Sequence, residues 1–102
     1  PWEKAKAFDN SAPIGKFISK QELGNGPINF ELKINGETKQ TGNSGDLIFS
    51  FDKVISFVSK FVTLKTGDLI YTGTPEGVGP VKIGDRLEGF LNGDSFLKLN
   101  IK

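Results

Sequence analysis

The 102-residue sequence contains no histidine, no cysteine and no methionine. Without cysteine and histidine the chain has no disulfide, thiolate nucleophile or imidazole base, and it lacks the usual ligands of a zinc site. Carboxylates, lysines, hydroxyls and the backbone are what remain for chemistry. The absence of cysteine fits a reducing compartment, and we expect a cytoplasmic protein.

An excess of charge of one sign and long apolar runs are also missing. The 13 Lys and Arg residues balance 12 Asp and Glu, so the net charge is +1. The basic residues form no cluster of the kind that neutralises nucleic-acid phosphates. No apolar run approaches the roughly 20 residues of a membrane-spanning helix. We therefore expect neither a nucleic-acid nor a membrane partner.

Glycine is abundant, with 13 residues that divide the chain into segments of strand length. Apolar and polar residues alternate over Asn29–Ile34, Asn35-Gly36 supplies a tight turn, and Glu37–Thr41 returns, which predicts a β-hairpin. A second hairpin is expected from Arg86–Leu91, the turn Asn92-Gly93-Asp94 and Ser95–Leu99. The pattern predicts a mainly β fold.

One segment has the spacing of a helix instead. Its apolar residues recur on one helical face, and Ser50 precedes them as a candidate N-cap, so we expect a short helix from about Phe51 to Phe61. The same β-branched residues are also compatible with a pair of strands. In the helical interpretation the residues facing the core are Val54, Ile55, Val58 and Phe61.

Two Gly-Asp pairs, Gly67-Asp68 and Gly84-Asp85, occur in similar contexts. Glycine accepts a positive φ and aspartate bonds nearby amides, so both pairs are interpreted as turns that start strands, the first over Asp68–Tyr71. The following loop, Thr72–Pro80, carries three glycines. It is a candidate ligand-binding loop, in which Gly73 lets the backbone approach an anion, or else an ordinary connection.

Lys6 lies among small and apolar residues near the start of the chain. A desolvated lysine there could stabilise the negative charge of an enolate or carboxylate, whereas most lysines are solvated surface groups. The carboxylates are scattered, without the close pair that a cation site needs. We expect no metal site within this chain.

Three stretches together resemble the fumarylacetoacetate hydrolase family, at that family's order and spacing. They are Lys4–Gly15, Asn35–Ser50 and Gly67–Pro80. The resemblance implies a mixed β-sandwich roll with few helices, which agrees with the one short helix expected near Phe51–Phe61, and an enzyme that usually dimerises. Such enzymes cleave C–C bonds of, decarboxylate or isomerise small β-diketo or 2-oxo acids. Mg²⁺ or Mn²⁺ stabilises the enolate in these reactions.

The resemblance also implies roles for single residues. Lys6 matches the family's catalytic lysine and Thr74 its substrate-binding threonine, beside Gly73. The family's metal ligands lie upstream of the lysine motif. Residues 1–102 are therefore expected to be the C-terminal portion of a catalytic domain, incomplete as a domain and inactive alone. The alternative is a noncatalytic β-rich binding module that uses the loop Thr72–Pro80.

Overall fold

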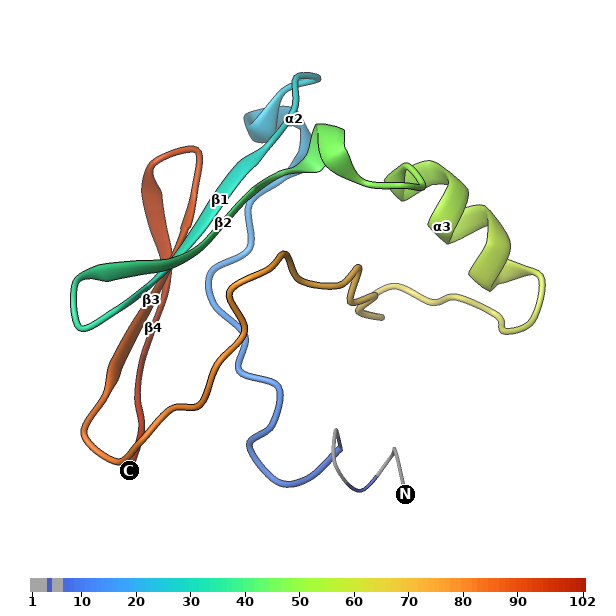
Figure 1. Ribbon diagram of the computed structural model, residues 1–102. Coiled ribbons are helices and arrows are strands. Elements are labelled where there is room, and N and C mark those ends of the chain that lie inside the picture. Colours follow the sequence, from blue (N-terminus) through green and yellow to red (C-terminus); the bar gives the residue numbers. More distant parts are fainter. Residues whose placement is uncertain (1–3, 5–6) are drawn as a thin grey trace.

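The computed structural model describes Lys4 and residues 7–102, and its main element is a four-stranded antiparallel sheet (Figure 1). The strand order is β2-β1-β3-β4. The strands are β1 (Asn29–Ile34), β2 (Glu37–Asn43), β3 (Arg86–Leu91) and β4 (Asp94–Asn100). Both predicted hairpins are present, β1 pairs with β3 between them, and the prediction of a mainly β fold is confirmed.

Each hairpin closes through an Asn-Gly pair with positive φ at both residues, 53° and 82° at Asn35 and Gly36 and 49° and 88° at Asn92 and Gly93. These values are typical of the two-residue turns that match the twist of a hairpin. The second turn is one residue shorter than predicted, because Asp94 already pairs with Leu91.

The turn asparagines also join the two hairpins to each other. The Asn35 side-chain oxygen accepts from the Arg86 amide (2.9 Å), at the start of β3. In the same way the Asn92 side-chain oxygen accepts from the Asn29 amide (2.9 Å), at the start of β1. Each turn is therefore bonded to the first residue of the other hairpin.

Both hairpins contain one extra residue in their second strand. Gln40 lies opposite Leu32 but Thr38 lies opposite Lys33, so Lys39 is the additional residue of β2. In β4 the corresponding residue is Phe96. Such bulges twist the strand and redirect the side chains that follow.

The helices of the described chain are α2 (Lys20–Leu23), the 3-10 turn η1 (Ser44–Asp46) and α3 (Phe51–Ser59). The prediction of a helix near Phe51–Phe61 is confirmed, and the strand pair is excluded there. The Ser50 hydroxyl accepts from the Lys53 amide (3.2 Å), the bond of an N-cap. None of the described helices has the length and apolar character needed to cross a membrane.

The apolar face of α3 is largely uncovered, contrary to the expectation that it faces a core. Val54 and Val58 are half-buried, but Ile55 is 47% exposed and Phe61 73% exposed. The helix projects away from the sheet (Figure 1), and no other described helix or strand makes extensive contact with it.

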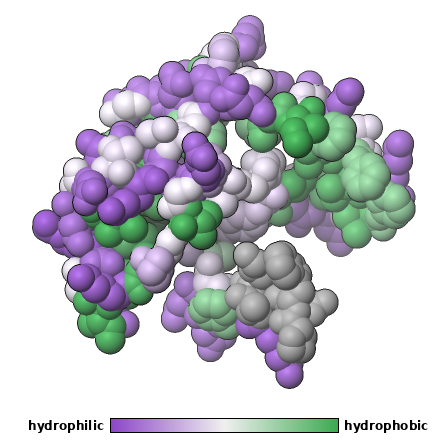
Figure 2. Space-filling model, in the orientation of Figure 1, coloured by the Kyte–Doolittle hydropathy of each residue, from purple (hydrophilic) through white to green (hydrophobic). Residues whose placement is uncertain are grey.

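Apolar side chains are exposed to solvent elsewhere too, and none of those in the described residues is fully buried. The radius of gyration is 14.9 Å, against about 13 Å for a compact chain of this length. Figure 2 shows apolar side chains gathered at the surface over the region of α3. Within the described residues, the four-stranded sheet is thus held together by the hydrogen bonds between its strands more than by a buried apolar core.

One predicted strand is absent. Asp68–Tyr71 carries no ladder pairing, because no described strand runs beside it. The turns themselves are as predicted, with φ of 96° at Gly67 and 98° at Gly84. Only the second turn leads directly into a strand, β3.

Candidate functional site

The loop Thr72–Pro80 runs past the sheet without regular secondary structure and is attached to β2 (Figure 1). The side-chain nitrogen of Gln40 donates to the Thr74 hydroxyl oxygen (2.8 Å) and to the Pro75 carbonyl oxygen (2.8 Å). Gly77, at φ 103°, lies so close to the Lys39 carbonyl oxygen that a Cβ atom would clash with it. The loop is held by β2 at two places.

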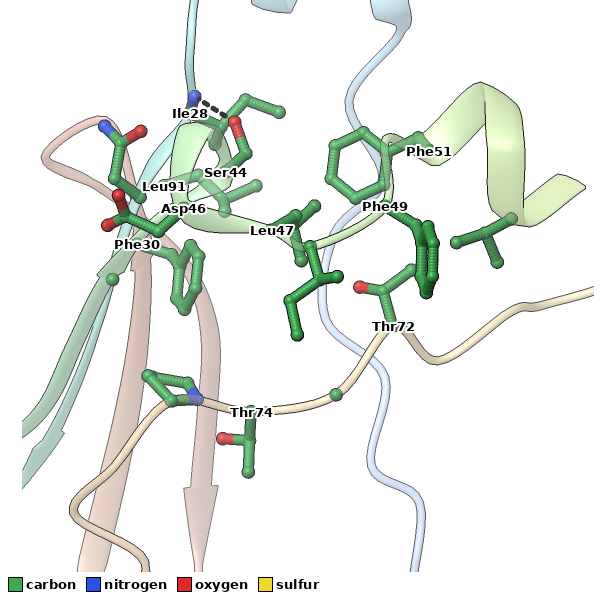
Figure 3. A pocket seen from close by; sticks show the side chains of 16 residues that line it. Ile28, Phe30, Ser44, Asp46, Leu47, Phe49, Phe51, Thr72, Thr74 and Leu91 are labelled. Atoms are coloured by element: carbon green, nitrogen blue, oxygen red, sulfur yellow. Dashed lines mark hydrogen bonds between the residues drawn. The ribbon is translucent and has the colours of Figure 1, made fainter.

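An open cavity of about 580 Å³ lies between this loop, the sheet and the segment that leads into α3. Its walls are mostly apolar, with Phe30, Leu47, Phe49, Phe51, Val54 and Leu91 among them. Ser44 and Asp46 of η1 add polar atoms at one end. The Ser44 hydroxyl accepts from the Ile28 amide (2.7 Å), which fixes η1 against the start of β1 (Figure 3).

The two threonines of the loop point in different directions. In Figure 3 the side chain of Thr72 extends toward Phe49 and the cavity, whereas that of Thr74 extends away from these apolar residues. The exposed Thr74 hydroxyl is bonded to Gln40 instead. Thr74 is among the residues that line the cavity, but its side chain points away from Phe30 and Phe49 in Figure 3.

The structure tests the placement of the predicted site residues only in part. Gly73, with φ 97° and open space where a Cβ would stand, and Thr74 lie together in the attached loop. Lys6 lies outside the described residues, so its distance from Thr74 is not part of the structure. Gln40 was not foreseen as a site residue, because it looks like one more polar residue of a hairpin.

Among the described residues, no three side chains of the metal-binding types come together. Asp46 contributes a single carboxylate at the edge of the cavity. The described residues therefore do not by themselves offer the ligand set of a metal centre.

Asp85 is buried, with 6% exposure, and has a structural role. Its carboxylate accepts from the Lys82 amide (3.0 Å) and from the Asn35 side-chain nitrogen (2.9 Å). These bonds, the backbone bond from Lys82 first, lower the pKa of Asp85. The charged Asp85 carboxylate thus joins the Asn35-Gly36 turn to the segment that leads into β3.

Comparison with known proteins identifies the family. Residues 1–101 match the family described as fumarylacetoacetate (FAA) hydrolase C-terminal, and the chain belongs to this family. It is 48% identical to the oxaloacetate tautomerase YcgM of Escherichia coli over 93% of the chain and 44% of that protein. It is 42% identical to the mitochondrial oxaloacetate tautomerase FAHD1 of Mus musculus over 100% of the chain and 47% of that protein.

Solved structures give the same result. A fumarylacetoacetate hydrolase family protein of Yersinia pestis superposes on the whole chain with a TM-score of 0.92 and 48% identity, using 47% of its own length. A fumarylpyruvate hydrolase of Pseudomonas aeruginosa, solved with Mn²⁺ and pyruvate, has a TM-score of 0.90 and 40% identity over 99% of the chain and 44% of its own length. The chain thus spans about half the length of the relatives it matches.

Proposed function

We propose that the whole protein is an enzyme that acts on a small 2-oxo or β-diketo acid with the help of a divalent cation. The observation that carries this proposal is the 40% identity to the Pseudomonas aeruginosa fumarylpyruvate hydrolase that was solved with Mn²⁺ and pyruvate. Enol–keto interconversion of oxaloacetate and hydrolytic cleavage of an acylpyruvate to pyruvate and a carboxylic acid are the two candidate reactions.

The attached loop supplies the binding step. We assign Thr74 as a hydrogen-bond donor to an oxo or carboxylate oxygen of the acid. Gly73 has no side chain that would obstruct the approach of that ligand. The space where a Cβ atom would stand is also open, with no contact within 4 Å. A hydrogen bond to a charged oxygen contributes about 1.5–3 kcal/mol, enough to orient a small acid.

Three further assignments belong to the same proposal. Lys6 supplies positive charge to an enolate-like intermediate, as its place in the family motif implies. The cation, Mg²⁺ or Mn²⁺, takes its ligands from outside the described residues and supplies Lewis-acid stabilisation of the enolate. The protein works as a homodimer, which size-exclusion chromatography with light scattering tests directly.

The test is an assay of the whole protein with oxaloacetate and with fumarylpyruvate, in Mn²⁺ and after chelation. We expect turnover of one of these acids that is lost on chelation. Thr74→Val, which removes the hydroxyl at nearly constant volume, should lower kcat/KM roughly ten- to a hundredfold. Lys6→Met should reduce kcat while the protein stays folded.

Turnover that survives chelation would contradict the metal requirement. A protein that binds pyruvate without converting any acid would be the noncatalytic binding module. Unchanged kinetics in Thr74→Val would return the loop Thr72–Pro80 to the role of a connection.

A further inference from the structure

Gln40 joins β2 to the loop through both hydrogens of its side-chain amide. One bond runs to the Thr74 hydroxyl oxygen and the other to the Pro75 carbonyl oxygen, each at 2.8 Å. A carbonyl oxygen can only accept a hydrogen bond, so the amide nitrogen, not the amide oxygen, must face Pro75. The same nitrogen reaches Thr74, and the Thr74 oxygen is therefore the acceptor in that bond.

This arrangement determines what the Thr74 hydroxyl can offer to a ligand. A hydroxyl has one proton and two lone pairs. Gln40 uses a lone pair, so the proton stays available, and no acceptor within the described part of the chain takes it. Thr74 is exposed. Its hydroxyl is consequently set to donate, which suits an acid oxygen and not a cationic or donor group.

The extra residue of β2 is what brings Gln40 to this position. In an unbroken ladder continuing from the pair Lys33–Thr38, Gln40 would lie opposite Glu31. With Lys39 inserted it lies opposite Leu32, on the other face of the hairpin, because directly paired residues share a face. The bulged Lys39 meanwhile presents its carbonyl to Gly77. The bulge thus serves both attachments of the loop.

We propose that Gln40 is a positioning residue that fixes the loop Thr72–Pro80 on β2 and directs the Thr74 hydroxyl proton to the acid group of the substrate. The second part rests on the proposed function. The first part, attachment of the loop, is independent of what the protein acts on.

The test uses the whole protein with Mn²⁺ and compares Gln40→Leu, Thr74→Val and the double variant, with oxaloacetate and fumarylpyruvate as substrates. Gln21→Leu is the matched control, because Gln21 is the other glutamine, exposed on α2 and remote from the loop in sequence. If Gln40 acts through Thr74, its loss lowers kcat/KM by about tenfold when Thr74 is present and by less than twofold in the Thr74→Val background.

Equal losses in the two backgrounds would overturn the proposal, since a general structural defect adds to the Thr74 effect. No loss in either would overturn it as well. Should Gln40→Leu fail to fold, Gln40→Glu keeps the shape of the side chain. Its carboxylate accepts a hydrogen bond from the Thr74 hydroxyl, which then cannot donate to the substrate. Activity relative to the native protein should therefore recover as the pH falls and the carboxyl is protonated. A constant ratio across pH would count against the proposal.

Hydrogen exchange separates this inference from the proposed function. In Gln40→Leu the amides of residues 72–74 and 76–79 should exchange faster than in the native protein and in Gln21→Leu. Unchanged exchange overturns the attachment whatever the substrate. If the native protein converts no acid, the proposed function fails, and faster exchange in Gln40→Leu still supports the attachment.

Discussion

Gly77 is a residue at which the loop Thr72–Pro80 lies against the backbone of β2. Two independent constraints meet there. Its φ of 103° lies in the region that residues with a Cβ avoid, and its Cβ direction points at the Lys39 carbonyl oxygen. Gly79, two residues on, has open space and no such φ.

Gly77→Ala should therefore destabilise the protein by about 1–3 kcal/mol, through backbone strain and displacement of the loop. Gly79→Ala is the matched control and should change stability by less than about 0.5 kcal/mol. Chemical denaturation of both variants measures the difference. Equal midpoints for the two variants would mean that the loop does not rest on Lys39.

Asp85 gives a prediction in pH. Its pKa is lowered by the bonds from the Lys82 amide and the Asn35 side chain, so the folded protein holds the charged form more tightly than the unfolded chain does. The stabilisation is present above the usual aspartate pKa of about 3.9 and is lost as the pH falls below it.

Asp85→Asn should therefore flatten the acid limb of the stability profile below about pH 4, while Asp9→Asn, at an exposed position, corrects for the loss of one charge. Thermal melts across pH 2.5–7 measure this. If both variants keep the native acid limb, the Asp85 carboxylate does not contribute to it.

The site residues differ in how far the sequence determines them. The density of glycine and threonine indicated the loop Thr72–Pro80 and Gly73, and the family resemblance indicated Thr74; the binding role of both residues stays a prediction. Gln40 was not predicted, because it lies 34 residues from Thr74 in the sequence. Its side chain also faces the loop only because β2 contains one inserted residue. Patterns of alternation do not reveal a bulge, which exists only as a property of the paired strands.

At the scale of elements, the two hairpins repeat one design: six residues, an Asn-Gly turn, and a second strand with an extra residue at the third position. The carbonyls of both extra residues are met by a glycine of a passing loop, Gly77 at Lys39 and Gly15 at Phe96. The turn asparagines clamp the opposite hairpins. The hairpins therefore stabilise one another at both ends of their shared boundary.

Asn35→Gly and Asn92→Gly keep the positive φ of each turn but remove these clamps. Each should lower stability by about 1–2 kcal/mol, and Asn35→Gly by more, because it also removes a bond to the Asp85 carboxylate. Asn25→Gly, in an exposed loop before β1, is the control for the flexibility of an added glycine. Denaturant midpoints give the ranking, and equal values for all three variants would mean that the asparagine bonds between the hairpins do not stabilise the protein.

The elements were predictable where short-range pattern decides them. Alternation and Asn-Gly turns located all four strands, and the Ser50 cap with helical spacing located α3. The strand expected over Asp68–Tyr71 failed because a strand needs a neighbour to bond with, and an apolar segment of four residues does not carry that information.

At the scale of the whole molecule, many large apolar side chains of the described chain are exposed, and none is fully buried. Ile48 is 92% exposed, and Phe49, Phe57 and Phe61 are exposed nearby. Curated relatives are about twice as long as this chain. In a protein of that length, further chain would be available to cover this surface.

We expect the 102-residue chain made alone to bind the dye ANS strongly and to associate at micromolar concentration, since large apolar patches are sticky in water. The whole protein should bind the dye weakly. Fluorescence and analytical ultracentrifugation check both. A monomeric 102-residue chain without dye binding would mean that its apolar side chains pack among themselves in solution.

The reciprocal asparagine bonds also bear on the route by which the sheet is reached. Each hairpin can close by itself in about 1–10 μs, because its strands are neighbours in sequence. The bonds between hairpins join residues 51 and 63 positions apart. Closing such a long segment costs chain entropy before any contact compensates for it. The hairpins should thus form and dissolve many times, and the encounter of two formed hairpins should set the folding rate.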